Sequence, residues 1–239
     1  MKADTMQIAA PDISRISSEV ELLEDLLPLK DAAVLELGCG KAEKTSMVAQ
    51  RAASVLALEV DTVQLARNQS RSDLPNVRFE RGGAESIPAD NASFDIVLMF
   101  KSLHHVPVDK MDAAFVEIHR VLKPGGIVYI SEPVYAGDFN EILRLFHDEQ
   151  KVREDAFAAE QRAVASGRFS LHTQEFFLQP MHFADFAQFE DQVLKVTHTT
   201  HRLSQALYQQ VREKFNRHLS ADGARFHMPI RADLFVRNP

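Results

Sequence analysis

A short apolar run followed by two glycines decides the fold of this chain. It reads Val34-Leu35-Glu36-Leu37-Gly38-Cys39-Gly40. The apolar residues predict a buried strand, and the glycines predict a tight turn into a helix expected from about Lys44 to Ala52. Because ligands bind beyond the carboxyl ends of strands in an open parallel sheet, this turn is expected to lie beside a ligand.

Strands and helices alternate on both sides of this stretch. The first helix is expected between Asp12, its cap, and Leu27, followed by the strand that begins at Ala33. Further strands are expected at 54–59, 77–79, 94–99 and 127–130, with helices at 62–69 and 111–121 between them. This alternation predicts a Rossmann-like α/β fold, a mostly parallel sheet with right-handed crossovers and helices on both faces.

The pattern changes after the fifth strand. Residues 134–170 are polar and helical, which predicts an insertion or lid packed over the edge of the sheet. A sixth strand is expected at 174–178, helices at 185–194 and 203–219, and a last strand at 225–237. No linker or repeat interrupts the chain, so residues 1–239 are expected to form a single domain. Its predicted parts are an N-terminal helical cap (1–30), a core (31–133), the insertion (134–170) and a C-terminal completion of the sheet (171–239).

The amino-acid composition limits the classes of protein to which this chain can belong. An apolar fraction of 45% and a charged fraction of 26% are typical of a folded domain, and the net charge of −7 argues against a nucleic-acid partner. Cys39 is the one cysteine, so no intramolecular disulfide is possible. The sequence shows neither a signal peptide nor an apolar run long enough to cross a membrane, which predicts a cytoplasmic protein without a membrane partner. The ten histidines include no ligand-spaced pair on a helix face, so no metal site is expected.

Glu59 ends the second predicted strand, about 20 residues after Gly38, which is the spacing at which an acidic side chain meets an adenosine ribose. A carboxylate accepts hydrogen bonds from ribose hydroxyls and repels a 2′-phosphate. The glycine turn lacks the third glycine of a dinucleotide site, because Gly40 is followed by Lys41, Ala42 and Glu43. The missing third glycine, which serves packing around a pyrophosphate, therefore indicates a nucleoside cofactor without phosphates.

Five segments in order resemble the class I S-adenosylmethionine (SAM)-dependent methyltransferases, especially the small-molecule branch of the methyltransferase domain 11 type. They are Val34–Gly40, Val55–Asp61, Val77–Pro88, Phe94–Val106 and Arg120–Gly126. The resemblance covers roughly residues 31 to 133. It implies a Rossmann-like fold and SAM as the cofactor.

The resemblance also implies which residues contact SAM. Glu36 is expected near the methionine portion, and Phe100 to offer its carbonyl to the methionine amino group. The remaining expected contacts are Gly38, Cys39 and Gly40 along the backbone turn, Glu59 and Val60 at the ribose, and Ala84 and Glu85 at the adenine. Two positions depart from the family pattern, because Gly83 stands where an aspartate is common and Ala42 replaces a glycine.

Catalysis by such an enzyme depends mainly on aligning donor and acceptor, because the leaving group is already good. A general base helps where the acceptor carries a proton. The residues that follow strands four and five are therefore candidates, namely His104, His105 and Tyr135 as catalytic residues, with Lys101 and Glu132 nearby in the sequence.

These observations predict an enzyme that transfers a methyl group from SAM to a small-molecule acceptor (EC 2.1.1.-). Two alternatives stay open. The first is a SAM-binding regulatory module without turnover, which the departure at Gly83 suggests. The second is a nicotinamide-dependent oxidoreductase, which only the glycine turn suggests.

Overall fold

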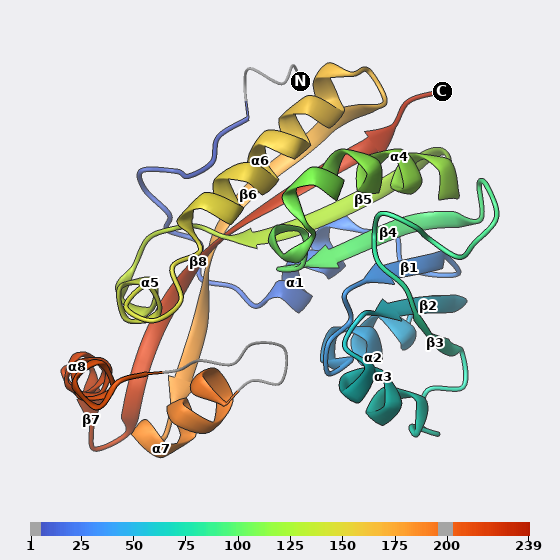
Figure 1. The fold of residues 1–239 in the computed structure, drawn as a ribbon. Helices are drawn as coiled ribbons and strands as arrows, with labels where there is room; N and C mark the ends of the chain where they lie inside the picture. Colours follow the sequence, from blue (N-terminus) through green and yellow to red (C-terminus); the bar gives the residue numbers. More distant parts are fainter. Residues whose placement is uncertain (1–5, 196–202) are drawn as a thin grey trace.

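The computed structural model describes residues 6–195 and 203–239. Its eight-stranded sheet has the order β3-β2-β1-β4-β5-β8-β6, with β7 paired to β8 (Figure 1). The strands are β1 (Ala33–Leu37), β2 (Ser54–Glu59), β3 (Val77–Arg81), β4 (Phe94–Phe100), β5 (Leu122–Pro133), β6 (Phe169–Phe183), β7 (Leu219–Ser220) and β8 (Gly223–Arg237). Strands β1 to β5 pair in parallel, whereas β8 is antiparallel to both β5 and β6. The predicted mostly parallel α/β sheet is confirmed.

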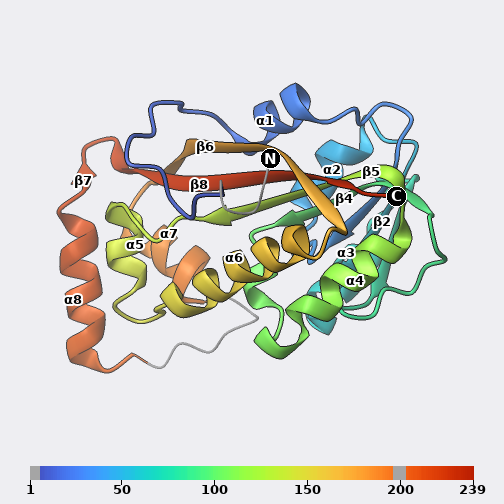
Figure 2. The same ribbon diagram turned by 90° about the horizontal axis from the view of Figure 1, so that it is seen from above.

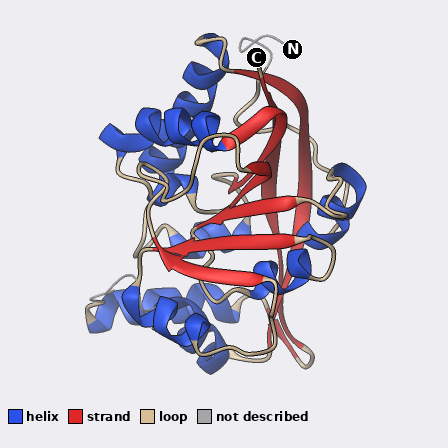
Figure 3. Ribbon diagram, turned by 90° about the vertical axis from the view of Figure 1, so that its right-hand side faces the viewer, coloured by secondary structure: helices blue, strands red, loops and turns tan. Residues whose placement is uncertain are grey.

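Helices cover both faces of this sheet (Figure 3). They are α1 (Glu19–Leu26), α2 (Glu43–Ala49), α3 (Thr62–Gln69), α4 (Met111–Val121), α5 (Asp138–Leu143), α6 (Gln150–Ala165), α7 (Phe186–Phe189) and α8 (Gln205–Asn216), with short turns η2 (Leu103–His105), η3 (Val108–Lys110) and η4 (Glu190–Leu194). Leu35 packs in one apolar cluster with α4 and α6, and its neighbour Val34 packs in another with α1, α2 and α3. Alternate residues of one strand thus enter opposite layers. Within the described residues, no helix is both long and apolar enough to cross a bilayer.

The first helix is shorter than the sequence pattern predicted. It begins after Ser18, whose side chain forms a capping box with Glu21, and not after Asp12. Ile16 lies instead in a parallel bridge with Leu178 of β6. The apolar spacing before residue 18 therefore reflects an extended segment beside the sheet, and the cap assignment to Asp12 was wrong.

The insertion after β5 includes α6, which packs on one face of the sheet. Ala156, Phe157 and Ala159 of α6 share an apolar cluster with α4 and with Phe169 and Leu171 of β6. Strand β6 is the last strand of the sheet, beyond β5 and β8. Helix α6 therefore lies over the edge of the sheet, and a lid role for this segment stays a prediction.

The two C-terminal strands form a long antiparallel ribbon. Strand β6 begins at Phe169, earlier than the predicted start at Gln174, because it pairs with β8 along most of its length. The ribbon extends past the parallel strands, and α5, α7 and α8 gather around its far end (Figures 1 and 2). A separate apolar cluster fills this end and includes Phe139, Phe183, Phe189, Phe215 and Phe226.

Candidate functional site

The glycine turn after β1 and the carboxylate that ends β2 are in direct contact. The Gly40 N–H donates to Glu59 Oε2 at 2.7 Å. Glu59 Oε1 accepts hydrogen bonds from the N–H groups of Val60 at 2.8 Å and Asp61 at 2.9 Å. A carboxylate has about four acceptor positions, so these three donors leave about one open, on Oε2. The backbone therefore fixes the Glu59 carboxylate beside the turn.

The glycine turn also packs closely against the segment that follows β4. Gly38 has a φ of +76°, and a Cβ atom there would lie 2.8 Å from Ser102 Cβ. A Cβ on Gly40 would instead meet nothing within 4 Å, so the backbone at Gly40 is open to a ligand. Ala42, which replaces the third glycine, keeps a positive φ of 58° as the residue before α2. The turn thus retains a conformation that favours glycine where the sequence has alanine.

A pocket of about 620 Å³ lies at the carboxyl ends of β1 and β4. Its lining comprises Glu19, Glu36, Gly38, Cys39, Gly40, Lys41, Glu43, Lys44, Phe100, Lys101 and Gln192. Five of the predicted cofactor contacts are therefore gathered in one cavity, and Glu59 adjoins it through Gly40. The size suits a small-molecule ligand.

The predicted adenine segment lies beside the end of β2. The Gly82 N–H donates to the Glu59 carbonyl at 3.4 Å, and Ala84 is buried in the core. The Glu85 carboxylate folds over Gly83, where a Cβ would meet Glu85 Oε2 at 2.4 Å, and accepts a hydrogen bond from Lys110 at 3.0 Å. The Glu85 side chain therefore occupies the space that a side chain at position 83 would fill.

Glu36 is a buried carboxyl group that faces the pocket with an unused acceptor. Its residue is 1% exposed, and Oε2 has no hydrogen-bond partner within the part of the chain that the structure describes. Burial raises the pKa of Glu36 to about 8. An unpaired buried acid beside a cavity is a feature that a cationic ligand would satisfy.

Glu36→Gln is expected to raise the free energy of unfolding at pH 8 and to change it little at pH 4.5 or below. The folded-state pKa of about 8 lies above the ordinary 4.5, so ionising Glu36 destabilises the fold as pH rises between these values. The cost is at most about 1.4 kcal/mol per pH unit in that window. Urea unfolding at pH 5 and pH 8 measures the difference. Glu80→Gln, at a partly exposed acid on β3, is the control and should show no such gain; an equal gain for Glu36→Gln at both pH values contradicts the prediction.

Two pocket residues pair across the site. Lys101, with a φ of 54°, donates from Nζ to Gln179 Oε1 at 2.9 Å and lies 3.5 Å from Glu19 Oε2. Burial lowers the pKa of Lys101. The sequence analysis did not identify Glu19 as a site residue, because it lies in α1, outside every motif.

A second polar cluster lies at the η2 turn, which directly follows Lys101 and Ser102 in the sequence. His104 Nδ1 contacts Glu132 Oε2, while Glu132 Oε1 accepts a hydrogen bond from the Leu103 N–H at 2.9 Å. Burial alone would lower the pKa of His104, but the carboxylates of Glu132 and Glu149 raise it to about 9. His104 is therefore clamped in one orientation by Glu132.

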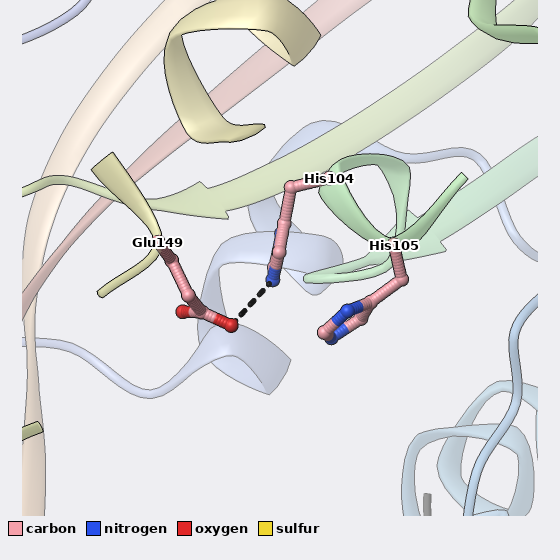
Figure 4. A group of neighbouring side chains, drawn as sticks. All are labelled: His104, His105 and Glu149. Carbon is pink, nitrogen blue, oxygen red and sulfur yellow. Dashed lines mark ion pairs between the residues drawn. The ribbon is translucent and has the colours of Figure 1, made fainter. Parts of the chain in front are cut away.

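Glu149 and His105 complete this cluster (Figure 4). Glu149 Oε1 lies 3.6 Å from His104 Nε2, and its other oxygen accepts from Arg153 at 2.5 Å. The His105 ring lies over the His104 ring, with centroids 4.1 Å apart. Sequence analysis did not single out Glu149, since it stands outside every motif.

Tyr135 is placed differently from the two histidines. Its ring is covered by the Arg144 guanidinium, 5.4 Å from the ring centroid. Burial and the neighbouring Asp148 carboxylate raise the pKa of its hydroxyl. His104 and His105 are thus gathered in one cluster, whereas Tyr135 lies just before α5 and has other contacts.

Comparisons with known proteins find similarity to methyltransferases. A family described as "Methyltransferase domain" matches residues 34–126. An uncharacterised methyltransferase of Synechocystis is 33% identical over 105 residues, which are 44% of this chain and 49% of that protein. The trans-aconitate 2-methyltransferase of Deinococcus radiodurans is 34% identical over 114 residues, 46% of this chain and 42% of that protein. The chain thus matches about half or less of the length of these relatives.

Solved structures share the fold over most of the chain. The YcgJ protein from Bacillus subtilis aligns with a TM-score of 0.65 and 18% identity, covering 92% of this chain and 98% of that one. The [4+2]-cyclase SpnF aligns with a TM-score of 0.58 and 19% identity, covering 96% of this chain and 88% of that one. Residues 34–126 are thus similar to methyltransferase domains, and the chain shares the Rossmann-like fold of these solved structures over most of its length.

Proposed function

We propose that this chain binds SAM in the pocket at the ends of β1 and β4 and transfers its methyl group to a small-molecule acceptor. The observation that carries the proposal is the contact between the Gly40 N–H and Glu59 Oε2, at 2.7 Å. This hydrogen bond connects a backbone turn that is open to a ligand with a carboxylate that can bind a ribose hydroxyl. The buried acid Glu36 supplies the matching group for a cationic amine at the other end of the pocket.

The residues present fit SAM portion by portion. Glu36 Oε2 would accept a hydrogen bond from the methionine ammonium group, with the Phe100 carbonyl as a second acceptor. Glu59 would bind one ribose hydroxyl through the open acceptor position on Oε2. The other ribose hydroxyl would have to displace one of the backbone N–H donors of Glu59 or bind elsewhere. Val60 is 63% exposed although it is apolar, which offers a surface for a planar base. Ala84 and Glu85 lie on the other side of Glu59 and would approach the adenine.

The chemistry follows from this placement. SAM supplies a methyl group on a sulfonium, which is already a good leaving group. The chain contributes a partly enclosed pocket and positions both reactants. Of the proposed catalytic residues, His105 is exposed and is the better placed to touch an acceptor. His104 is buried and held by Glu132, so it would act by orienting its neighbours and setting the local charge. Tyr135 would form the wall of the acceptor site on the side of α5.

A small-molecule acceptor is the class that the relatives support. One is named for trans-aconitate, and another, from Mycobacterium leprae, is a phthiotriol/phenolphthiotriol dimycocerosates methyltransferase, 35% identical over 41% of this chain and 36% of that protein. The net charge of −7 opposes binding to a nucleic-acid backbone.

A SAM-binding protein without methyl transfer is the second candidate. It is favoured by the likeness in fold to SpnF, which is named a [4+2]-cyclase and not a methyltransferase. Binding and transfer therefore need separate measurements.

Isothermal titration with SAM, S-adenosylhomocysteine and NAD tests the first step. We expect binding of the two sulfur compounds in the micromolar range and none of NAD. Absence of heat with S-adenosylhomocysteine at high micromolar concentration would overturn the proposal. Methyl-labelled SAM with a panel of hydroxyl, carboxyl and amine acceptors tests the second step. Labelled product supports transfer, and tight binding with no product across the panel favours the second candidate.

A further inference from the structure

The side chains of His104, His105 and Glu149 converge on one point (Figure 4). Each offers one ligand atom, and these atoms all lie within 4.8 Å of one another. The histidines come from η2, and Glu149 directly precedes α6. Two imidazoles with one carboxylate form a donor set typical of zinc and other first-row transition metals.

Glu132 fixes the orientation that a metal ligand needs. Its carboxylate contacts His104 Nδ1, so the other ring nitrogen, Nε2, faces Glu149. Carboxylate–histidine–metal arrangements of this kind set the tautomer and raise the basicity of the ligand. Glu132 is itself 2% exposed and accepts a hydrogen bond from the Leu103 N–H at 2.9 Å. The His104 ring therefore cannot turn away without breaking buried contacts.

Glu149 is held from the opposite side. Arg153 donates to Oε2 at 2.5 Å, and Arg153 in turn donates to Asn140 Oδ1 at 3.1 Å. His147 Nε2 lies 2.9 Å from Oε1, the oxygen that faces His104. One carboxylate oxygen is thus occupied by a guanidinium, and the other lies between the imidazoles of His147 and His104.

The separation of the ligands fits a bridging ion. His104 Nε2 and Glu149 Oε1 are 3.6 Å apart, longer than an ordinary hydrogen bond. Two ligands of one tetrahedral zinc ion, each at 2.0–2.1 Å from the metal, are separated by about 3.4 Å. The carboxylates of Glu132 and Glu149 lie on opposite sides of the His104 ring, and Arg153 and His147 contact Glu149. The separation of His104 Nε2 and Glu149 Oε1 is thus suited to a cation.

We propose that His104, His105 and Glu149 bind a divalent transition-metal ion, with Zn²⁺ as the probe, and that Glu132 is the positioning residue of this site. The sequence analysis expected no metal because it sought a ligand pair on one helix face. Here the carboxylate ligand comes from a segment far along the chain. Three protein ligands leave at least one coordination position open. If the proposed function holds, this open position is where an oxygen of the acceptor would bind.

Metal binding is measured without SAM, on the full chain after treatment with a chelator. Titration with Zn²⁺ by calorimetry is expected to show one ion per chain and a rise in melting temperature. His105→Ala and Glu149→Gln should each weaken binding at least about 10-fold, and Glu132→Gln should weaken it about 10- to 100-fold. His172→Ala, at an exposed histidine on β6, is the matched control and should bind as the wild type.

The outcomes separate this inference from the proposed function. His105→Ala binding Zn²⁺ as tightly as the wild type, or no stoichiometric binding by the wild type, overturns the metal site. Because His105 is exposed, its replacement should leave the fold intact, which circular dichroism verifies. S-adenosylhomocysteine binding by the metal-free protein tests the cofactor pocket alone. Its presence with no Zn²⁺ binding rejects only the metal site, and its absence with normal Zn²⁺ binding rejects only the proposed function.

Discussion

Glu59→Ala is expected to weaken binding of S-adenosylhomocysteine roughly 100-fold. The loss has two sources, the ribose acceptor and the organisation of the turn. Hydrogen bonds to a charged acceptor contribute about 1.5–3 kcal/mol each, and about 1.4 kcal/mol corresponds to a tenfold change in affinity. The same carboxylate accepts from the N–H groups of Gly40, Val60 and Asp61, which alanine leaves without that acceptor. Isothermal titration measures the change.

Glu59→Gln separates these two sources. Glutamine keeps the shape and one acceptor oxygen, so binding should fall less than with alanine. The control is Glu80→Ala on the neighbouring strand, where the carboxylate pairs with Arg78 at 2.6 Å and should have no part in binding. A Glu59→Ala protein that melts like the wild type and binds with unchanged affinity would contradict the role given to Glu59.

The parallel half of the fold could be predicted because its signals are local. Helix α3 occupies Thr62–Gln69, the predicted range, because Asp61 caps it through the N–H groups of Val63 and Gln64. The predicted start of α1 was wrong because apolar spacing over a few residues does not distinguish a helix from an extended segment. The Ser18–Glu21 capping box was present in the sequence and marks the true start.

The C-terminal half depends on pairing between distant segments. Phe169 pairs with Arg237 and Phe183 with Ala224, so the length of β6 is set by β8. No pattern within β6 alone contains that information, and the prediction therefore stopped at its most apolar part. Strand propensity is a weak guide where the partner strand decides.

The same distinction applies to the site. Gly38, Gly40 and Glu59 lie in two consecutive strand–turn units, so topology brings them together and sequence spacing could anticipate the contact. His104 was identified from its place after β4. Its partner Glu149 lies in a segment without a motif, and only the packing of α6 beside α4 brings the two together.

Arg231→Met is expected to be the most destabilising single change in the core, with a loss of about 3–5 kcal/mol in the free energy of unfolding. Arg231 is 3% exposed and donates from Nε to Asp233 Oδ2 at 2.5 Å and from Nη2 to Glu160 Oε2 at 2.8 Å. Its guanidinium lies 4.5 Å from the centroid of the Phe157 ring. Methionine fills similar space but leaves two buried carboxylates without their cation.

The loss should depend on pH in a definite direction. Burial already raises the pKa of Glu160, and removing Arg231 raises it further because the opposing charge is gone. A buried acid whose folded-state pKa is raised destabilises the fold as pH increases, so the difference from the wild type should shrink at pH 5 and grow at pH 8. Urea unfolding at both pH values measures it.

Two further variants decide the interpretation. Arg162→Met breaks an exposed pair with Asp112 from the same helix that carries Glu160, and it should move the urea midpoint little. Adding Glu160→Gln and Asp233→Asn to Arg231→Met removes the unpaired charges and should recover part of the loss. A wild-type midpoint for Arg231→Met, or no recovery in the triple variant, contradicts the argument. Recovery means that the arginine serves chiefly to neutralise the two acids, and that the layer between β8 and α6 is stable only while its charges balance.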